Sequence, residues 1–355
     1  MMKNFNIAED TITTQITVTN GFFDGGVGTL NGLGGVNLTT SSLSTTQKQY
    51  YYNLQYNSKD HFSISYGHIG GSGSAVESAT QEGTTQAIYK QFFNFVEPNS
   101  ENVRDTAGWS MIDGTNGSNA VTQADVYILA AERLQMKDRL NPGTWTVTLS
   151  GSTTAGALTQ ISLTDDSKTV DAESAPFGPR YNIVSGSAGT VQEAYTSKTY
   201  GFFYPDAGLM VLSANALSSS IPGTSGYIQS GSGVDTEGAG LAPDTRVVSD
   251  ADNANKLVVA LQNDSVTLRS EEQQYIYDYF CRAKASEFNL SQNLTFWSGS
   301  QYEIRHSDMV TNPQTFISEV GLYDGQNQLV AVGRLSSPIN KNFSSEAIVK
   351  VRLTY

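Results

Sequence analysis

The sequence predicts a mainly β protein with a few short helices, divided into several domains with extended arms and long loops. Three observations support this prediction. Several segments alternate apolar and polar residues with the period of two that is typical of strands. The 18 Tyr and 15 Phe supply much of the apolar mass, and aromatic side chains suit pleated surfaces. Charged residues make up only 15% of the 355 residues, while Gly, Ser, Thr, Asn and Gln are abundant, as in β proteins with many turns.

Residues 1–60 are expected to form an extended N-terminal arm. The segment TITTQITVTN (11–20) alternates as one strand. It is followed by the loop FFDGGVGTLNGLGGVNLTT (22–40), whose glycines permit positive φ angles. This composition favours an arm over a compact domain.

Residues 61–217 are expected to form a β-rich central domain with one or two helices. Phe62, Ile64 and Tyr66 alternate with polar residues as in a half-buried strand, and a Gly/Ser loop follows. A helix is predicted over 84–96, before Pro98. Its apolar stripe comprises Ile88, Phe92, Phe95 and Val96.

The rest of the central domain is expected to consist mostly of strands. The segment 125–140 is ambiguous between a helix and a strand that runs into an extended segment. TWTVTLSGS (144–152) and LTQISLTDD (158–166) are predicted strands. YGFFYPDAGLMVLSA (200–214) is a predicted hairpin, because its Pro-Asp-Ala-Gly sequence suits a turn.

The Gly, Ser, Pro and Asp rich residues 218–249 predict a long exposed loop or an interface insert. Residues 250–355 are expected to form a C-terminal β domain that starts with a short helix over 253–261. In its first strand, one face would carry Tyr275, Tyr277, Tyr279 and Cys281. Two strands around the turn Asp324–Asn327 follow, and a last strand would build the chain end into a sheet. Predicted core positions are Ile317, Val320, Leu322, Leu329, Ala331 and Val332.

Residues able to carry chemistry show no catalytic or metal-binding motif. His61, His68 and His306 lack metal-ligand spacing, so structural or solvated roles are expected. The run Gly67–Gly73 lacks the Gly-Lys-Ser/Thr ending of a phosphate loop. We interpret it as a flexible turn that another backbone approaches closely. Cys281, the single cysteine, is expected to act as a small buried hydrophobe.

Asp165, Asp166, Asp171 and Glu173 raise the alternatives of glycoside cleavage or calcium binding. Acidic neighbours in a chain of net charge -13 are more often a solvated face, and no calcium-loop sequence is present. We therefore expect no catalytic residue, no metal and no cofactor. The acidic balance argues against nucleic acid as a partner. No apolar run is long enough to span a membrane, and the first residues lack a secretory signal, so a soluble protein made in a cytoplasm is expected.

The segment ISEVGLYDGQNQLVAVGRLSSPI (317–339) resembles a pattern of tailed-bacteriophage tail proteins, I-x-E-x-G-L-[FY]-D-x-x-x-x-L-[IV]-A-V. Three other stretches resemble structural proteins of contractile-tailed phages, including T-even-like myoviruses of cyanobacteria. They are DHFSISYGHIGGSGS (60–74), TTQAIYKQFFNF (84–95) and YGFFYPDAGLMVLS (200–213). The resemblance spans residue 50 to the C-terminus. It implies a structural, non-enzymatic baseplate or tail component of a virion, synthesised in the host cytoplasm.

The implied partners are other phage tail or baseplate proteins and copies of the chain itself in a symmetric particle. The interface candidates are Gly67, His68, Gly70, Gly71, Gly73, Tyr323, Asp324 and Tyr355. One alternative is a receptor-binding or fibre-type adhesin that stacks glycans on Trp109 or Trp297. A neck or capsid-surface structural protein is another. A polysaccharide-cleaving enzyme is disfavoured, because no organised carboxylate pair is evident.

Overall fold

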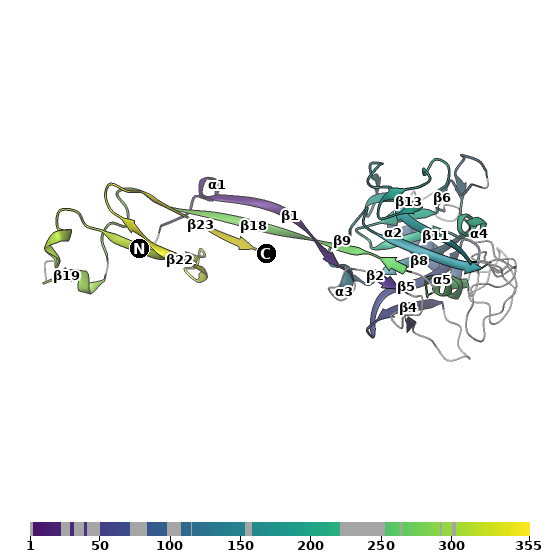
Figure 1. Cartoon of the computed structure of the whole chain (residues 1–355), viewed down its shortest axis with the longest axis horizontal. Helices are drawn as coiled ribbons and strands as arrows, with labels where there is room; N and C mark the ends of the chain where they lie inside the picture. Colours follow the sequence, from purple (N-terminus) through teal and green to yellow (C-terminus); the bar gives the residue numbers. More distant parts are fainter. Residues whose placement is uncertain are drawn as a thin grey trace. The chain divides into compact units, whose positions relative to one another are not determined.

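The computed structural model describes most of the chain and divides it into two compact units (Figure 1). The described residues are 3–22, 29–31, 39–40, 50–71, 84–97, 108–114, 116–152, 158–220, 253–262, 265–291, 293–299 and 303–355. The terminal unit comprises Met1–Thr17 and Gln273–Tyr355, and the central unit comprises Val18–Glu272. Strands predominate throughout the described residues, which confirms the predicted mainly β class. None of their helices is long and apolar enough to cross a bilayer.

The central unit is organised around an antiparallel sheet of 13 strands. In spatial order, eleven of these strands are β2 (Thr29–Asn31), β17 (Ser265–Thr267), β10 (Thr146–Ser152), β11 (Leu158–Asp165), β13 (Gly178–Ser187), β15 (Gly201–Tyr204), β16 (Leu209–Ser213), β8 (Asp125–Ala131), β5 (Lys59–His68), β4 (Tyr51–Tyr56) and β3 (Thr39–Thr40). The short strands β12 (Glu173–Ala175) and β14 (Thr190–Val191) pair with β13. Elsewhere in the unit, β6 (Ser110–Met111) pairs with β7 (Val121–Thr122).

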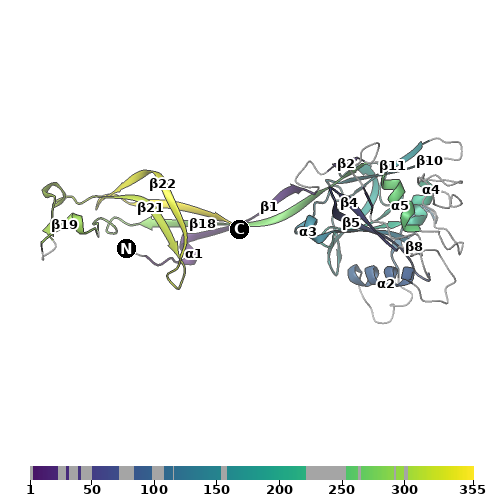
Figure 2. The same cartoon turned by 90° about the horizontal axis from the view of Figure 1, so that it is seen from below.

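Two hydrophobic cores cover the two faces of this sheet. The helices of the unit are α2 (Thr84–Val96), α3 (Arg133–Met136), α4 (Ala214–Ser220) and α5 (Asn253–Gln262), and Figure 2 shows α2 on the side of the sheet away from α4 and α5. In β8, Tyr127 and Leu129 face the core that includes α4 and α5. Val126 and Ile128 face the core that includes α2. Strands β15 and β16 are therefore buried along their whole length, because each face meets apolar side chains.

The terminal unit combines a small sheet with a hairpin. Its elements are α1 (Ile7–Asp10), part of β1 (Thr11–Gly21), part of β18 (Arg269–Ala283), β19 (Trp297–Ser298), β20 (Glu303–Ile304), β21 (Thr315–Tyr323), β22 (Leu329–Lys341), β23 (Ala347–Thr354) and two 3-10 helices, Leu294–Phe296 and Ser307–Met309. The sheet has the order β1-β18-β23, and the start of β18 also pairs with β9 (Arg139–Leu140). Beyond β23, the backbones of Tyr355 and Tyr275 exchange two hydrogen bonds. The predicted pairing of the last segment is confirmed.

The units divide the chain differently from the predicted boundaries at 60/61 and 249/250. Strand β4 lies within the predicted arm 1–60, yet it pairs with β5 and belongs to the central sheet. Helix α5 lies within the predicted domain 250–355, yet its apolar residues join the central core. Most of the predicted loop 22–40 and nearly all of the insert 218–249 lie outside the described residues.

Several predicted elements are confirmed. Helix α2 has the predicted bounds, the hairpin over 200–214 forms as β15 and β16, and the ambiguous segment 125–140 begins as strand β8. Two expectations about burial are wrong. Strand β5 is buried on both faces rather than half-buried. In α2, the buried face is rotated toward Tyr89 and Phe93, so Phe95 is 49% exposed and its ring contacts that of Phe177.

Candidate functional site

The predicted flexible turn Gly67–Gly73 is wrong at its start, because Gly67 and His68 are the last two residues of strand β5. A Cβ atom on Gly67 would lie 3.0 Å from the Cα of Tyr89, because helix α2 crosses β5 at this point. A Cβ on Gly71 would lie 2.5 Å from Thr85 Oγ1. The predicted close backbone approach is therefore confirmed at Gly67, where it serves helix–sheet packing. Gly73 lies outside the described residues.

His68 belongs to a polar cluster between β5 and β8. The Gly70 N–H donates to His68 Nδ1 (3.1 Å), which leaves Nε2 facing Asp125 Oδ1 at 3.7 Å. The Tyr66 hydroxyl also donates to Asp125. Burial raises the pKa of Asp125, and burial together with the Asp125 charge raises the pKa of Tyr66 well above its usual range. His68 and Asp125 are cross-strand neighbours, so the cluster joins two adjacent strands.

The predicted acidic face at Asp165 and Asp166 is wrong, because both residues are buried. Asp165 accepts the Gly143 N–H at 2.9 and 2.8 Å through its two oxygens. Asp166 accepts the backbone and side-chain N–H groups of Asn182. Burial raises the pKa of both carboxyl groups. Through these hydrogen bonds, the two buried carboxylates connect the end of β11 to Gly143 and to β13.

The other candidates for chemistry are dispersed. His61 is buried beside the rings of Phe22 and Tyr56, and His306 is exposed. Cys281 packs against the core of the terminal unit, and burial raises the pKa of its thiol. Among the described residues, no group of three or more His, Cys, Asp or Glu side chains is arranged to hold a metal ion.

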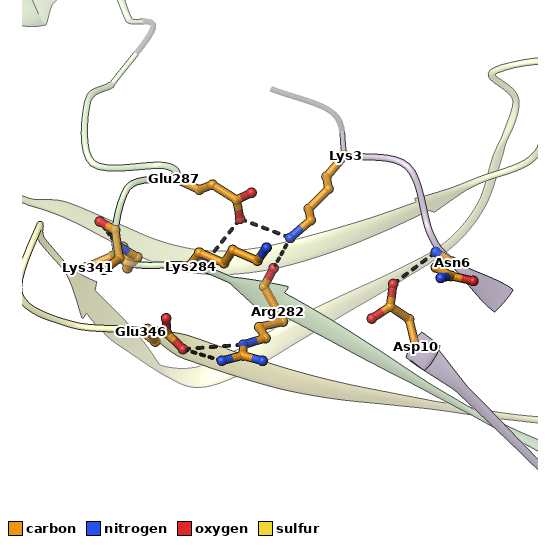
Figure 3. Close-up of polar contacts among 9 residues, drawn as sticks. Lys3, Asn6, Asp10, Arg282, Lys284, Glu287, Lys341 and Glu346 are labelled. Carbon is orange, nitrogen blue, oxygen red and sulfur yellow. Dashed lines mark hydrogen bonds and ion pairs between the residues drawn. The ribbon is translucent and has the colours of Figure 1, made fainter. Parts of the chain in front are cut away.

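The terminal unit contains a pocket of about 330 Å³ next to the loop between β18 and β19. Its lining comprises Lys3, Ser286, Glu287, Phe288, Asn289, Leu290 and Phe343. Lys3 Nζ donates to Glu287 Oε2 (3.0 Å) and to the Arg282 carbonyl (2.9 Å), as Figure 3 shows. The Lys284 N–H and then the Lys3 ammonium hold the pKa of Glu287 below its usual range. The two charged groups of the pocket thus already bind each other.

Lys341 fixes the same loop from the end of β22. Its side chain is fully buried, and Nζ donates to Asn289 Oδ1 (2.6 Å), Asn342 O (2.8 Å) and Ala285 O (3.1 Å). Phe288 has a φ of +57°, a conformation that is unfavourable for a bulky residue. The contacts of Lys341 and Asn289 hold the loop in this shape.

The predicted terminal residues lie at the tip and edge of the strands. Asp324 Oδ1 accepts the N–H groups of Gln326 and Gln328, both at 2.8 Å, which confirms its place in the turn. Tyr323 is 49% exposed, so it lies outside the core. Tyr355 is also exposed.

The core of the terminal unit lies between the hairpin and the β18–β23 pair. Its buried members are Leu322, Val349 and Val351. Partly buried around them are Tyr279, Cys281, Val320, Ala331, Leu335, Ile339 and Leu353. The predicted core positions Leu329 and Val332 are wrong, because they are 54% and 51% exposed. Val332 pairs with Gly321 in the register while Leu322 pairs with Ala331, so the two pairs point to opposite faces.

We name the opposite surface the outer hairpin face: Glu319, Gly321, Tyr323, Leu329, Val332 and Arg334. A Cβ on Gly321 would lie 3.0 Å from the Tyr323 ring and 3.3 Å from Leu329 Cδ1. Both side chains therefore lie over Gly321, next to Val332. At one end of the face, Arg334 Nε lies 3.3 Å from Glu319 Oε2, with both side chains exposed.

The sequence predicted Tyr323 as an interface candidate, but it did not indicate four other members of this surface, Glu319, Leu329, Val332 and Arg334. The available signal was the period of two, which places Glu319, Gly321 and Tyr323 on one side of their strand. Comparison with protein families, curated proteins and solved structures found no match to this chain.

Proposed function

We propose that the chain is a virion structural protein of a contractile-tailed phage, a baseplate or tail component that assembles through noncovalent interfaces with other tail proteins. The observation that carries this proposal is the distribution of exposed apolar side chains. Of the 18 large apolar residues exposed in the described part of the chain, 14 belong to the terminal unit. Concentrations of exposed apolar side chains mark interaction sites, whereas scattered ones are normal.

The small core of the terminal unit supports the same proposal. Among its described residues, the buried apolar members are Ala283, Phe296, Leu322, Ala347, Val349 and Val351. Burial of apolar area is the main favourable contribution to folding. A unit that buries so few of its own apolar side chains gains further stability when partners cover the exposed ones.

The adhesin alternative receives less support. Trp109 is 1% exposed, and its indole N–H donates to the Tyr204 hydroxyl at 3.2 Å, so it offers no surface for stacking a sugar. Trp297 is half-buried and donates to the Ser291 carbonyl. We therefore propose a structural rather than a receptor-binding or catalytic role.

The test is to locate the chain in purified particles. Virions of the phage that carries the gene are purified on a density gradient, analysed by mass spectrometry, and labelled with antibody raised against the recombinant chain. We expect peptides of the chain at a constant ratio to known tail proteins, with label on the tail. Absence from purified virions overturns the proposal. Label at the neck or on the capsid overturns the baseplate or tail location.

A further inference from the structure

We propose that two copies of this chain associate through the outer hairpin face, about a two-fold axis that lies in the interface parallel to β21 and β22. This interface rests on the proposed assembly role, and the partner that binds the outer hairpin face is a second copy of the chain.

The face has an apolar centre. Tyr323, Leu329 and Val332 are each about half exposed, and Tyr323 and Leu329 lie together over Gly321. Exposed aromatic and aliphatic groups gathered on one face of a strand pair form the type of centre found in protein interfaces.

The charged end of the face is complementary to itself. Glu319 and Arg334 occupy directly paired positions on the two strands. A two-fold rotation about an axis parallel to the strands leaves the position of each residue along the strand direction unchanged. It places β21 of one copy over β22 of the other. Glu319 of each copy then faces Arg334 of the other, so two identical faces form two ion pairs.

Nearly all of the net negative charge lies in the central unit, so repulsion between copies is smallest at the terminal unit. The terminal unit has eight Lys and Arg against nine Asp and Glu, a net charge of -1. The central unit has 13 against 25, a net charge of -12. Identical central units repel each other, whereas near-neutral surfaces associate readily. This distribution favours a second copy as the occupant.

The test uses sedimentation velocity of the full-length chain over a range of concentrations. We expect a reversible dimer. Glu319→Arg alone and Arg334→Glu alone each place like charges opposite each other twice per dimer, so each should raise the dissociation constant at least about tenfold. The double variant Glu319→Arg/Arg334→Glu restores both pairs and should restore the dimer. Both side chains are exposed, so folding should be retained, and circular dichroism checks it.

A matched control uses another exposed Glu–Arg ion pair among the described residues of the terminal unit. Glu346 binds Arg282 at 2.7 Å, so Glu346→Arg reverses a charge away from the outer hairpin face and should leave the dissociation constant unchanged. Likewise, Val332→Ser should weaken the dimer, whereas Ile348→Ser, at a similarly exposed β23 position, should not.

A monomer at all concentrations overturns the inference, as does a trimer or a dimer that is insensitive to Glu319→Arg. Failure of this inference is distinguishable from failure of the proposed function. A monomeric chain found in purified virions refutes only the two-fold interface. A charge-sensitive dimer absent from virions refutes only the virion role.

Discussion

Replacing Lys341 with Met tests whether this buried ammonium holds the loop between β18 and β19. Its three hydrogen bonds go to Ala285, Asn289 and Asn342. Hydrogen bonds to a charged group contribute about 1.5–3 kcal/mol each. Burial of the ammonium costs several kcal/mol in the opposite direction. The net loss expected for the folded loop is therefore about 2–4 kcal/mol.

The assay is hydrogen exchange of the full-length chain, read on peptides that cover Lys284–Ser291. A loss of 2–4 kcal/mol in the free energy of loop opening accelerates exchange about 30- to 700-fold. Lys284→Met is the matched control, because Lys284 is an exposed lysine in the same loop and its contact with Glu287 uses the backbone N–H. Unchanged protection of the loop in Lys341→Met would refute the reasoning. So would equal acceleration in both variants.

Three further predictions concern other contacts. Gly67→Ala places a Cβ against the backbone of α2 and should destabilise the central unit by about 1–3 kcal/mol in urea unfolding, whereas Gly325→Ala, with open space around it, should not. Hydrogen bonds from Arg352 and then Lys350 hold the pKa of Asp278 well below its usual range. Its contribution to stability is therefore complete above about pH 3.9 and is lost as the pH falls toward the lowered pKa; Asp278→Asn should remove this part of the acid dependence of the melting temperature. Arg180→Met removes the guanidinium that binds Glu97 and Glu173 and should lower the free energy of unfolding by about 3 kcal/mol; an unchanged unfolding midpoint would contradict this role.

Strong local periodicity made several elements predictable from the sequence. Helix α2 has an apolar stripe of period 3.6 and a proline after its end, and the hairpin over 200–214 has a turn whose Gly208 takes a φ of +66°. In each case the signal lies within about 15 residues. The same holds for the turn at Asp324, whose side chain binds N–H groups two and four residues later.

Features that depend on distant residues were not predictable in this way. Asp165 is buried because the N–H of Gly143, 22 residues earlier, binds its carboxylate, and no property of the acidic run itself indicates that donor. Similarly, α5 belongs to the central unit because of contacts made far along the chain. At the outer hairpin face, the run Leu329–Val332 contains too many apolar residues for alternation to separate core from surface.

Strands β16 and β22 show why it matters for function that a run of consecutive apolar residues does not reveal which face of a strand is buried. Both contain consecutive apolar residues, so both present apolar side chains on two faces. In β16, the second face is covered by helices of the same chain, and every residue is buried. In β22, Leu329, Val330 and Val332 stay exposed, and the one α-helix described in the terminal unit has only four residues. The same hydrophobic driving force acts on both strands. The proposed second copy of this chain would cover β22 as the helices cover β16, and the near-neutral, self-complementary hairpin face suits that copy.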